Sequence, residues 1–206
     1  MKSFYSLILI ISSFWFCALS VHAQDDYNSI DELLYDVHIR QYEKELERNV
    51  EKLIQQMKQF KYRPTPVKRV YIPKAGSEKK RPLGIPTYED KLVQGAFAEV
   101  LNAIYENIFM ECSYGFRKNR SCHDAVKELD RIIKEERINY IVDTDIEGFF
   151  DNVDHKWIIR FLEDKIQDKH FIRYIGRFLN SGIMEEGKKI RIDRGTPQGG
   201  NIRKKV

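Results

Sequence analysis

The chain has 206 residues, of which 42% are hydrophobic and 32% charged, with a formal net charge of +4 and an isoelectric point near 8.8. This composition describes a soluble globular protein with one good core or two small subdomains. The mildly basic balance permits nucleic acid as a partner without demanding it. The three cysteines include no Cys-x-x-Cys pair, which argues against a zinc site or a disulfide framework. Cys112 and Cys122 are expected to be ordinary thiols of a reducing compartment.

Residues 1–23 differ from the rest of the chain. Lys2 precedes an apolar run from Leu7 to Leu19, and Val21-His22-Ala23 resembles the small-residue site at which a signal peptide is cut. This is the outline of a secretory signal peptide. The run is too short, and too interrupted by serine, for a membrane span. The fold is therefore predicted from the residues that follow.

A helical segment and a basic hairpin are predicted next. Residues 24–63 form the helical segment, because apolar side chains recur there at helical spacing, in two pieces, before the first of two prolines. Residues 67–72 alternate basic and apolar side chains and predict a strand with one basic face. Residues 79–85 predict a second strand across a turn at 73–77.

Basic residues are concentrated around this hairpin. The cations are Lys58, Lys61, Arg63, Lys68, Arg69, Lys74, Lys79, Lys80 and Arg81. Such a run is often only a solvated face. Here Phe60, Tyr62 and Tyr71 are interleaved with it, which is typical of surfaces that follow a phosphate backbone.

The remaining elements follow from the spacing of their apolar residues. We predict a helix over 87–110, a loop over 111–120, helices over 121–136, 149–166 and 168–180, a strand over 140–146 and a hairpin over 181–194. Thr87, three residues before Asp90, begins the first of these helices as in a capping box. The mixture of elements predicts an α+β fold.

The predicted strand over 140–146 leads into a turn at Gly148. Its composition favours a partly or wholly buried strand. Side chains two apart on a strand share a face, so Asp143 and Asp145 could flank one site. Mg²⁺ is typically held by one or two carboxylates together with substrate phosphates.

Two other interpretations apply to this stretch. Its acids approach the pattern of a Ca²⁺ loop, through Asp143, Asp145, Glu147, Gly148 and Asp154. That loop needs a helix on both sides and a Glu at its twelfth position, whereas strand formers precede this one and Asp154 stands at that position. Alternatively, the acids only solvate a strand end and favour the start of the next helix.

Five blocks, in the same order, resemble the reverse transcriptases encoded by group II introns. They are Val70–Lys74 with Lys80–Thr87, Asp90–Gln94, Cys112–Ala125, Asp145–Asp151 and Gly195–Gly200. The resemblance covers about residues 50–201. It implies fingers and the first part of a palm over residues 64–206. It also implies RNA-directed DNA synthesis with two Mg²⁺ ions, an RNA template, a DNA primer, deoxynucleoside triphosphates and a group II intron RNA as cognate partner.

The resemblance also implies roles for single residues. Asp145 would bind both Mg²⁺ ions, with the carbonyl of Ile146 as a further ligand, because bridging metals stabilise the attacking and leaving oxygens of phosphoryl transfer. Lys74 and Arg81 would grip the incoming triphosphate. Asp143 would lie outside the metal's own ligands.

Further roles follow for the turn and the last block. Gly148 and Phe149 would offer backbone N–H groups to the same phosphates, and the missing Cβ of Gly148 permits a close approach. Phe150 would lie under the sugar and reject a 2′-hydroxyl, and Gln198 and Gly199 would support nucleotide and template. The expected nucleic-acid contacts are Lys68, Arg69, Lys79 and Lys80. Alternatively, each of these residues is an ordinary core or surface residue without a functional role.

One departure bears on activity. In this family a Tyr/Phe-x-Asp-Asp block supplies two more metal-binding carboxylates, and these 206 residues do not contain it. We therefore expect no appreciable polymerase activity from this polypeptide alone. The alternative function is a non-catalytic, maturase-like RNA-binding remnant that uses only the basic hairpin. Because an RNA-templated polymerase finds its substrates inside the cell, we expect a cytoplasmic protein despite the leader.

Overall fold

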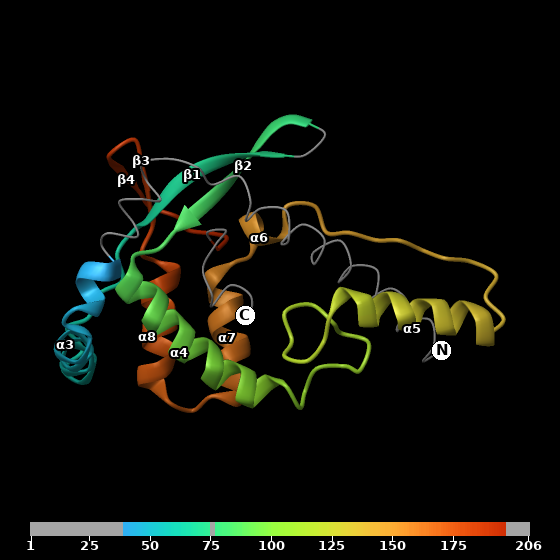
Figure 1. Ribbon diagram of the computed structural model, residues 1–206, viewed down its shortest axis with the longest axis horizontal. Coiled ribbons are helices and arrows are strands. Elements are labelled where there is room, and N and C mark those ends of the chain that lie inside the picture. The colour runs from blue at the N-terminus through green and yellow to red at the C-terminus, as the bar shows by residue number, and fades with distance from the viewer. Residues whose placement is uncertain (1–38, 75–76, 197–206) are drawn as a thin grey trace. The chain divides into compact units, whose positions relative to one another are not determined.

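The computed structural model describes residues 39–74 and 77–196 (Figure 1). It divides into two compact units, which are described separately. The helical unit is Ala98–Gly148, and the sheet unit holds residues 39–97 and 149–196. The predicted leader over 1–23 lies outside the described residues, and the predicted domain boundaries stay predictions. None of the described helices is both long and apolar enough to cross a membrane.

The sheet unit contains a four-stranded sheet with the strand order β2-β1-β3-β4. The hairpin of β1 (Val67–Lys74) and β2 (Ser77–Ile85) is antiparallel, as is that of β3 (Ile183–Glu185) and β4 (Lys188–Ile190). Both hairpins confirm the predictions. The structure adds a parallel pairing of β1 with β3, which joins the two hairpins into one sheet. The mixture of helices with this sheet agrees with the predicted α+β class.

The prediction of one basic face on β1 is wrong. Successive side chains of a strand point to opposite faces, so the adjacent Lys68 and Arg69 cannot share one. The register pairs Arg69 with Gly84 and Ile72 with Arg81. Arg69 therefore shares a face with Tyr71, whereas Lys68 shares the other face with Arg81.

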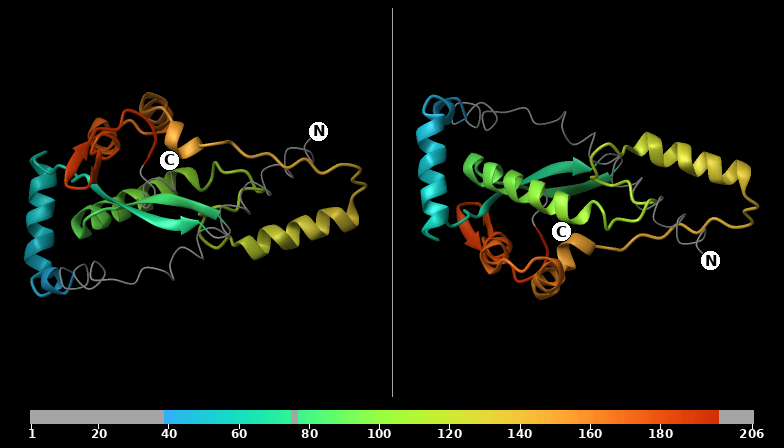
Figure 2. Two further views of the ribbon diagram at one scale, coloured as in Figure 1. Left: turned by 90° about the horizontal axis from the view of Figure 1, so that it is seen from above. Right: turned by 90° about the horizontal axis from the view of Figure 1, so that it is seen from below.

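Helices supply most of the buried side chains of this unit. They are α3 (Leu46–Lys58), the first half of α4 (Tyr88–Tyr105), α7 (His155–Lys165) and α8 (Lys169–Leu179). Figures 1 and 2 place α3 at the base of the β1–β2 hairpin, at the end opposite its tip. α8 contributes the buried side chains Ile172, Tyr174, Ile175, Phe178 and Leu179. The unit is therefore held largely by the apolar face of α8.

The boundaries of these helices follow from their caps. Asp168 begins α8 by accepting hydrogen bonds from the backbone N–H groups of His170 and Phe171. Asp154 begins α7 by accepting a hydrogen bond from Lys156 N–H. Because the backbone of Asp154 is extended, the predicted helix over 149–166 is divided into α6 (Phe149–Asn152) and α7. α4 ends five residues before its predicted limit.

The buried carboxylate of Asp90 ties both ends of the β1–β2 hairpin to α4. It accepts hydrogen bonds from the hydroxyls of Tyr62 and Thr65, from Thr65 N–H at 3.1 Å and from Thr87 Oγ1 at 2.8 Å. Thr65 stands just before β1 and Thr87 just after β2. Burial, and then the hydrogen bond to Asp90, raise the pKa of Tyr62, so its hydroxyl remains a donor.

The helical unit contains α5 (Cys122–Glu135), which begins with a complete capping box between Ser121 and Asp124. Its buried cluster is Cys112, Ala125 and Ile132, with Tyr114, Leu129 and Ile138 packed against it. Arg117 braces the loop before α5 by donating to the carbonyls of Met110 and Ser113 and to the carboxylate of Glu106. Cys112 and Cys122 are free thiols, as predicted.

The predicted strand over 140–146 is wrong. These residues are extended but pair with no strand among the described residues (Figure 1). Tyr140 is 81% exposed and Ile146 is 68% exposed. Strand propensity reflects packing against neighbouring strands, so β-branched and aromatic residues alone do not make a strand.

We expect Asp90→Ala to destabilise the 206-residue chain by about 3 kcal/mol or more, because it leaves buried donors of Tyr62 and Thr65 without an acceptor. Urea unfolding measures the change. Tyr62→Phe removes one donor and keeps the ring, and should cost about 1 kcal/mol. The exposed Asp164→Ala is the matched control. Equal midpoints for Asp90→Ala and Asp164→Ala would contradict the role of Asp90.

Candidate functional site

The segment Gly195–Thr196 lies tightly against the short helix α6. Thr196 N–H donates to the carbonyl of Phe150 at 2.8 Å, and Gly195 N–H donates to that of Val153 at 2.7 Å. A β-bridge joins Asp154 and Arg194 immediately before this segment. Two sequence blocks that are more than forty residues apart are therefore fastened to each other by backbone hydrogen bonds.

Two further features fix this contact. His155 is 8% exposed, and its Nε2 donates to the carbonyl oxygen of Gly195 at 2.7 Å. Gly195 has a φ of +74°, and a Cβ there would lie 2.6 Å from the carbonyl oxygen of Asp151 and 2.7 Å from that of Phe150. Only glycine fits this conformation and this space.

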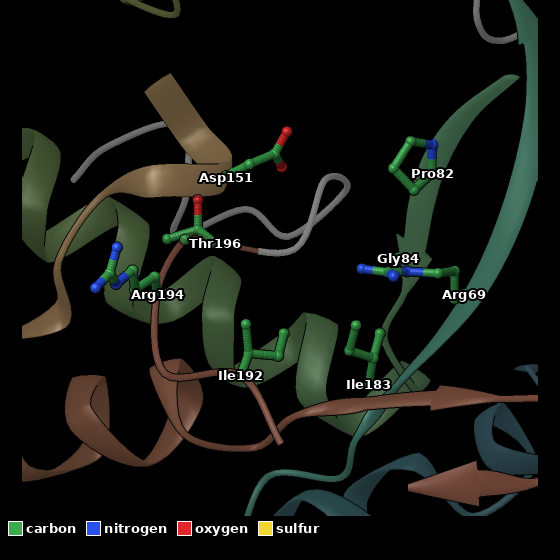
Figure 3. Close-up of a pocket in the computed structure, with 9 residues that line it drawn as sticks. Arg69, Pro82, Gly84, Asp151, Ile183, Ile192, Arg194 and Thr196 are labelled. Atoms are coloured by element: carbon green, nitrogen blue, oxygen red, sulfur yellow. The ribbon is translucent and has the colours of Figure 1, made fainter. Parts of the chain in front are cut away.

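A cavity of about 280 Å³ opens beside the Gly195–Thr196 segment within the sheet unit (Figure 3). Its lining residues come from β1, β2, β3, α6 and the segment after β4: Arg69, Pro82, Gly84, Asp151, Ile183, Ile192, Arg194, Gly195 and Thr196. Figure 3 shows Asp151 on the side opposite Pro82, with the isoleucines at the floor. The cavity thus combines an apolar floor with charged groups at its sides.

The charges around this cavity are partly compensated. Arg69 lies 3.6 Å from the carboxylate of Glu185, which also accepts a hydrogen bond from the hydroxyl of Tyr71. That hydrogen bond raises the pKa of Tyr71. Asp151 and Arg194 are exposed. The buried Oγ1 of Thr196 has no hydrogen-bond partner among the described residues.

Two predicted residues lie at this region: Arg69 lines the cavity, and Phe150 accepts the hydrogen bond from Thr196, whereas Arg81 lies on the hairpin face opposite Arg69. Phe150 is half-buried, and its ring meets that of Phe149 edge-on with centroids 5.2 Å apart. Arg81 is half-buried on β2, next to Ile72 of β1, and has no ion-pair partner among the described residues. Lys80 is exposed on the other face of the hairpin, the face of Arg69.

Some predicted residues are placed only by their backbone or not at all. Lys74 ends β1, where it pairs with Ser77, and Lys79 lies within β2. Gln198 and Gly199 lie outside the described residues. They follow Thr196 directly, so the start of their block is fixed by the contact with α6.

The predicted metal ligands lie at the end of the helical unit. Asp145 is exposed, and its Oδ1 accepts a hydrogen bond from the N–H of Ile146 at 3.0 Å. Gly148 has a φ of +60°, which a glycine adopts freely. In the part of the chain that the structure describes, no three His, Cys, Asp or Glu side chains gather closely enough to hold a metal ion.

Sequence reasoning missed four residues of this site. Asp151, Arg194 and Thr196 line the cavity, and His155 holds Gly195. Asp151 and Thr196 stand inside the sequence blocks that carried the resemblance, so their place in those blocks was the available signal. No sequence signal indicated His155 or Arg194, because their contacts form only when the two sequence blocks come together in the fold.

Residues 72–202 match the family described as reverse transcriptase (RNA-dependent DNA polymerase). The chain belongs to this family, which its sequence blocks had predicted.

Three known proteins are similar to most of this chain. Over 154 residues, or 75% of this chain, it is 44% identical to the group II intron-encoded protein LtrA of Lactococcus lactis subsp. cremoris. It is 40% identical over 150 residues, or 73% of this chain, to an uncharacterized 91 kDa protein in the cob intron of Schizosaccharomyces pombe. It is 35% identical over 144 residues, or 68% of this chain, to the protein YkfC of Escherichia coli. The matches span 25%, 18% and 38% of these relatives' own lengths.

Gly195→Ala should loosen the contact with α6. The new Cβ must move two carbonyl oxygens, so we expect a loss of about 2 kcal/mol or more. Hydrogen exchange of the 195 and 196 amides should accelerate. Gly187→Ala is the matched control, because Gly187 has a similar φ of +75° but nothing lies within 4 Å of an added Cβ. It should cost only about 1 kcal/mol. Unchanged protection in Gly195→Ala would refute the tight packing.

Proposed function

We propose that this chain supplies the fingers and the first part of the palm of a reverse transcriptase of the group II intron type. The observation that carries the proposal is the backbone contact of Thr196 with Phe150. It holds the start of the 195–200 block against the 145–151 block, beside a cavity whose other wall is the β1–β2 hairpin. Nucleotidyl transfer needs this kind of fixed arrangement, because phosphoryl transfer is catalysed by positioning and charge stabilisation.

Asp145 is proposed as a ligand of Mg²⁺, with the carbonyl of Ile146 beside it. The carboxylate is exposed and engaged only by the adjacent N–H among the described residues, so it fits a hard cation. When bound, Mg²⁺ would neutralise charge that develops on the transferring phosphate. Two ions require further carboxylates beyond Asp145, and for that reason we propose no appreciable polymerase activity for these 206 residues alone.

Arg81 and Lys74 are proposed to hold the triphosphate. The two positions lie on paired strands near the tip of the hairpin. Arg81 is not committed to an acid among the described residues, so its planar fork remains available for phosphate oxygens. Gly148 and Phe149 would add backbone N–H groups to the same phosphates.

Phe150 is proposed to contact the sugar. Its backbone is held by Thr196 and its ring is braced by Phe149, so the ring has a defined position. A rigid ring at this position would exclude a 2′-hydroxyl by bulk. Gln198 and Gly199, which follow the anchored Thr196, would support the nucleotide and the template.

The proposed partners are an RNA template, a DNA primer, deoxynucleoside triphosphates and a group II intron RNA. Lys68, Lys79 and Lys80, with Arg69, would contact the nucleic acid from the hairpin. Because Lys68 and Arg69 point to opposite faces, the hairpin would offer cations on both sides. With these substrates, we propose a cytoplasmic location for the activity.

A second candidate function is RNA binding without catalysis. The observation that favours it is the exposed, unpaired segment that carries Asp145 in the described structure. A carboxylate on such a segment is held less firmly than one on a sheet strand. In this case the basic hairpin would supply the whole activity, as a salt-sensitive contact with phosphates.

Arg81→Ala should weaken Mg²⁺-dependent binding of a deoxynucleoside triphosphate by about tenfold or more, because a charge-assisted hydrogen-bond pair is lost. Equilibrium dialysis with a labelled triphosphate and an RNA–DNA hybrid measures it. Arg191→Ala is the control, since Arg191 is exposed and lies 3.3 Å from Asp193. Equal affinities for the two variants would rule out Arg81 as a triphosphate ligand.

Asp145→Asn separates the two candidate functions. If Asp145 holds the metal, this variant should lose the Mg²⁺ dependence of triphosphate binding while its affinity for RNA at a fixed salt concentration stays the same. Metal-free triphosphate binding and circular dichroism are the accompanying controls. A variant that retains the full Mg²⁺ dependence would contradict the role of Asp145, and an unsubstituted chain that binds RNA but no triphosphate would favour RNA binding without catalysis.

A further inference from the structure

Three arginines meet where the chain leaves α3 and passes α8, away from the residues assigned above. Arg63 Nη1 donates to the carbonyl of Phe60 at 3.1 Å. The guanidinium of Arg173 lies 5.8 Å from the ring centroid of Phe60, and that of Arg177 lies 4.8 Å from that of Tyr174. All these residues belong to the sheet unit. We call Arg63, Arg173 and Arg177, with Phe60 and His170, the arginine–aromatic cluster.

No acid of the described residues is ion-paired with this cluster, whereas Arg69 and Arg117 each have such a partner. Burial, and then the charges of Arg63 and Arg173, lower the pKa of Arg177. Arg173 and Arg177 are four apart on α8, where like charges destabilise a helix. The fold therefore maintains a repulsion that a bound anion would relieve.

Arg177 shows a second sign of an incomplete environment. Its Nη1 donates to the carbonyl of Tyr62 at 2.9 Å, but its buried Nη2 has no hydrogen-bond partner in the described part of the chain. An unsatisfied buried donor on a charged group is costly. A solvated basic face does not contain such a group, so the simple surface interpretation does not account for Arg177.

Aromatic rings lie among these cations. His170 is exposed, and its ring lies 4.5 Å from that of Phe60 at an interplanar angle of 37°. Phe60 in turn stacks on Tyr174. Phe60 has a φ of +56°, an uncommon conformation for a residue with a side chain. Of these rings only His170 is exposed, and an exposed ring beside arginines is the arrangement that binds unstacked bases and their phosphates.

We propose that the arginine–aromatic cluster binds a single-stranded nucleic acid. Arg63 and Arg173, both exposed, contact the phosphates. His170, supported by Phe60, offers its open face to a base. Arg177, held by Tyr62 and Tyr174, adds positive charge from beneath. The site uses no residue of the cavity and needs no metal, so it is independent of the proposed nucleotidyl transfer.

The test measures binding of a short fluorescein-labelled oligouridylate RNA by anisotropy, without Mg²⁺, between about 50 and 200 mM salt. Arg63→Gln and Arg173→Gln should each weaken binding several-fold at low salt. Each should also reduce the slope of log K against log salt by about 0.7, the value for one lost phosphate contact on a single strand. A parallel titration with oligothymidylate DNA shows whether the 2′-hydroxyl contributes.

Arg160→Gln is the matched control. Arg160 is also exposed, and its guanidinium lies 5.1 Å from the ring centroid of Trp157 on another helix, α7. This variant should keep both the affinity and the slope. Unchanged slopes in Arg63→Gln and Arg173→Gln, or an equal loss in Arg160→Gln, would overturn the proposal. A loss with either RNA or DNA, confined to the cluster variants, supports it.

Thermal unfolding provides an independent readout. At low salt and without nucleic acid, Arg63→Gln should change the Tm little, because the lost repulsion of Arg177 offsets the lost hydrogen bond to the carbonyl of Phe60. Added oligouridylate should raise the Tm of the unsubstituted chain and of Arg160→Gln more than that of Arg63→Gln. Equal shifts in all three proteins count against the site. Neither result depends on the triphosphate binding of Arg81→Ala. The proposal for the arginine–aromatic cluster can therefore be refuted without refuting the proposed function.

Discussion

The buried carboxylate of Asp90 positions the hairpin on which the candidate site depends. A two-stranded ribbon is at best marginally stable alone, so its direction must be set at its base. Asp90 does this by accepting hydrogen bonds from Thr65, just before β1, and from Thr87, just after β2. The backbone N–H of Asp90 donates to Thr87 Oγ1 at 3.3 Å, which begins α4, and the carboxylate also accepts from the buried hydroxyl of Tyr62. One side chain thus fixes both ends of the hairpin and the helix that follows it.

The opposite wall of the cavity is linked to the hairpin through the sheet. β1 pairs with β3, β3 with β4, and the chain then runs through Arg194 to the segment held on α6. Each step is a backbone pairing, which is insensitive to most side-chain changes. Gly195 is the exception, because only a residue without a Cβ fits between the carbonyls of Phe150 and Asp151. Variation elsewhere in this region is therefore tolerated more easily than variation at Gly195.

Local patterns predicted the helices and both hairpins, because helix spacing, caps and glycine-containing turns are encoded within a few residues. They did not predict the pairing of β1 with β3, which joins residues over one hundred positions apart. They wrongly predicted a strand over 140–146, since apolar alternation cannot report whether a partner strand is present. For the site, the resemblance indicated Phe150 and the 195–200 block. The roles of His155 and Arg194 emerge only from the contact between the two blocks.

The distribution of acids beside the arginines carries more information than the net charge of +4. Arg117 is held by Glu106 and by two carbonyls, so its charge supports the fold of its loop. Arg69 is partly neutralised by Glu185 at the edge of the cavity. The arginine–aromatic cluster gathers guanidinium groups with no acid paired to them in the described structure. Clustered like charges destabilise the free protein, and a bound polyanion relieves their repulsion. On this reasoning, the cations that serve the fold and those that serve nucleic acid differ in whether the chain supplies a neighbouring carboxylate.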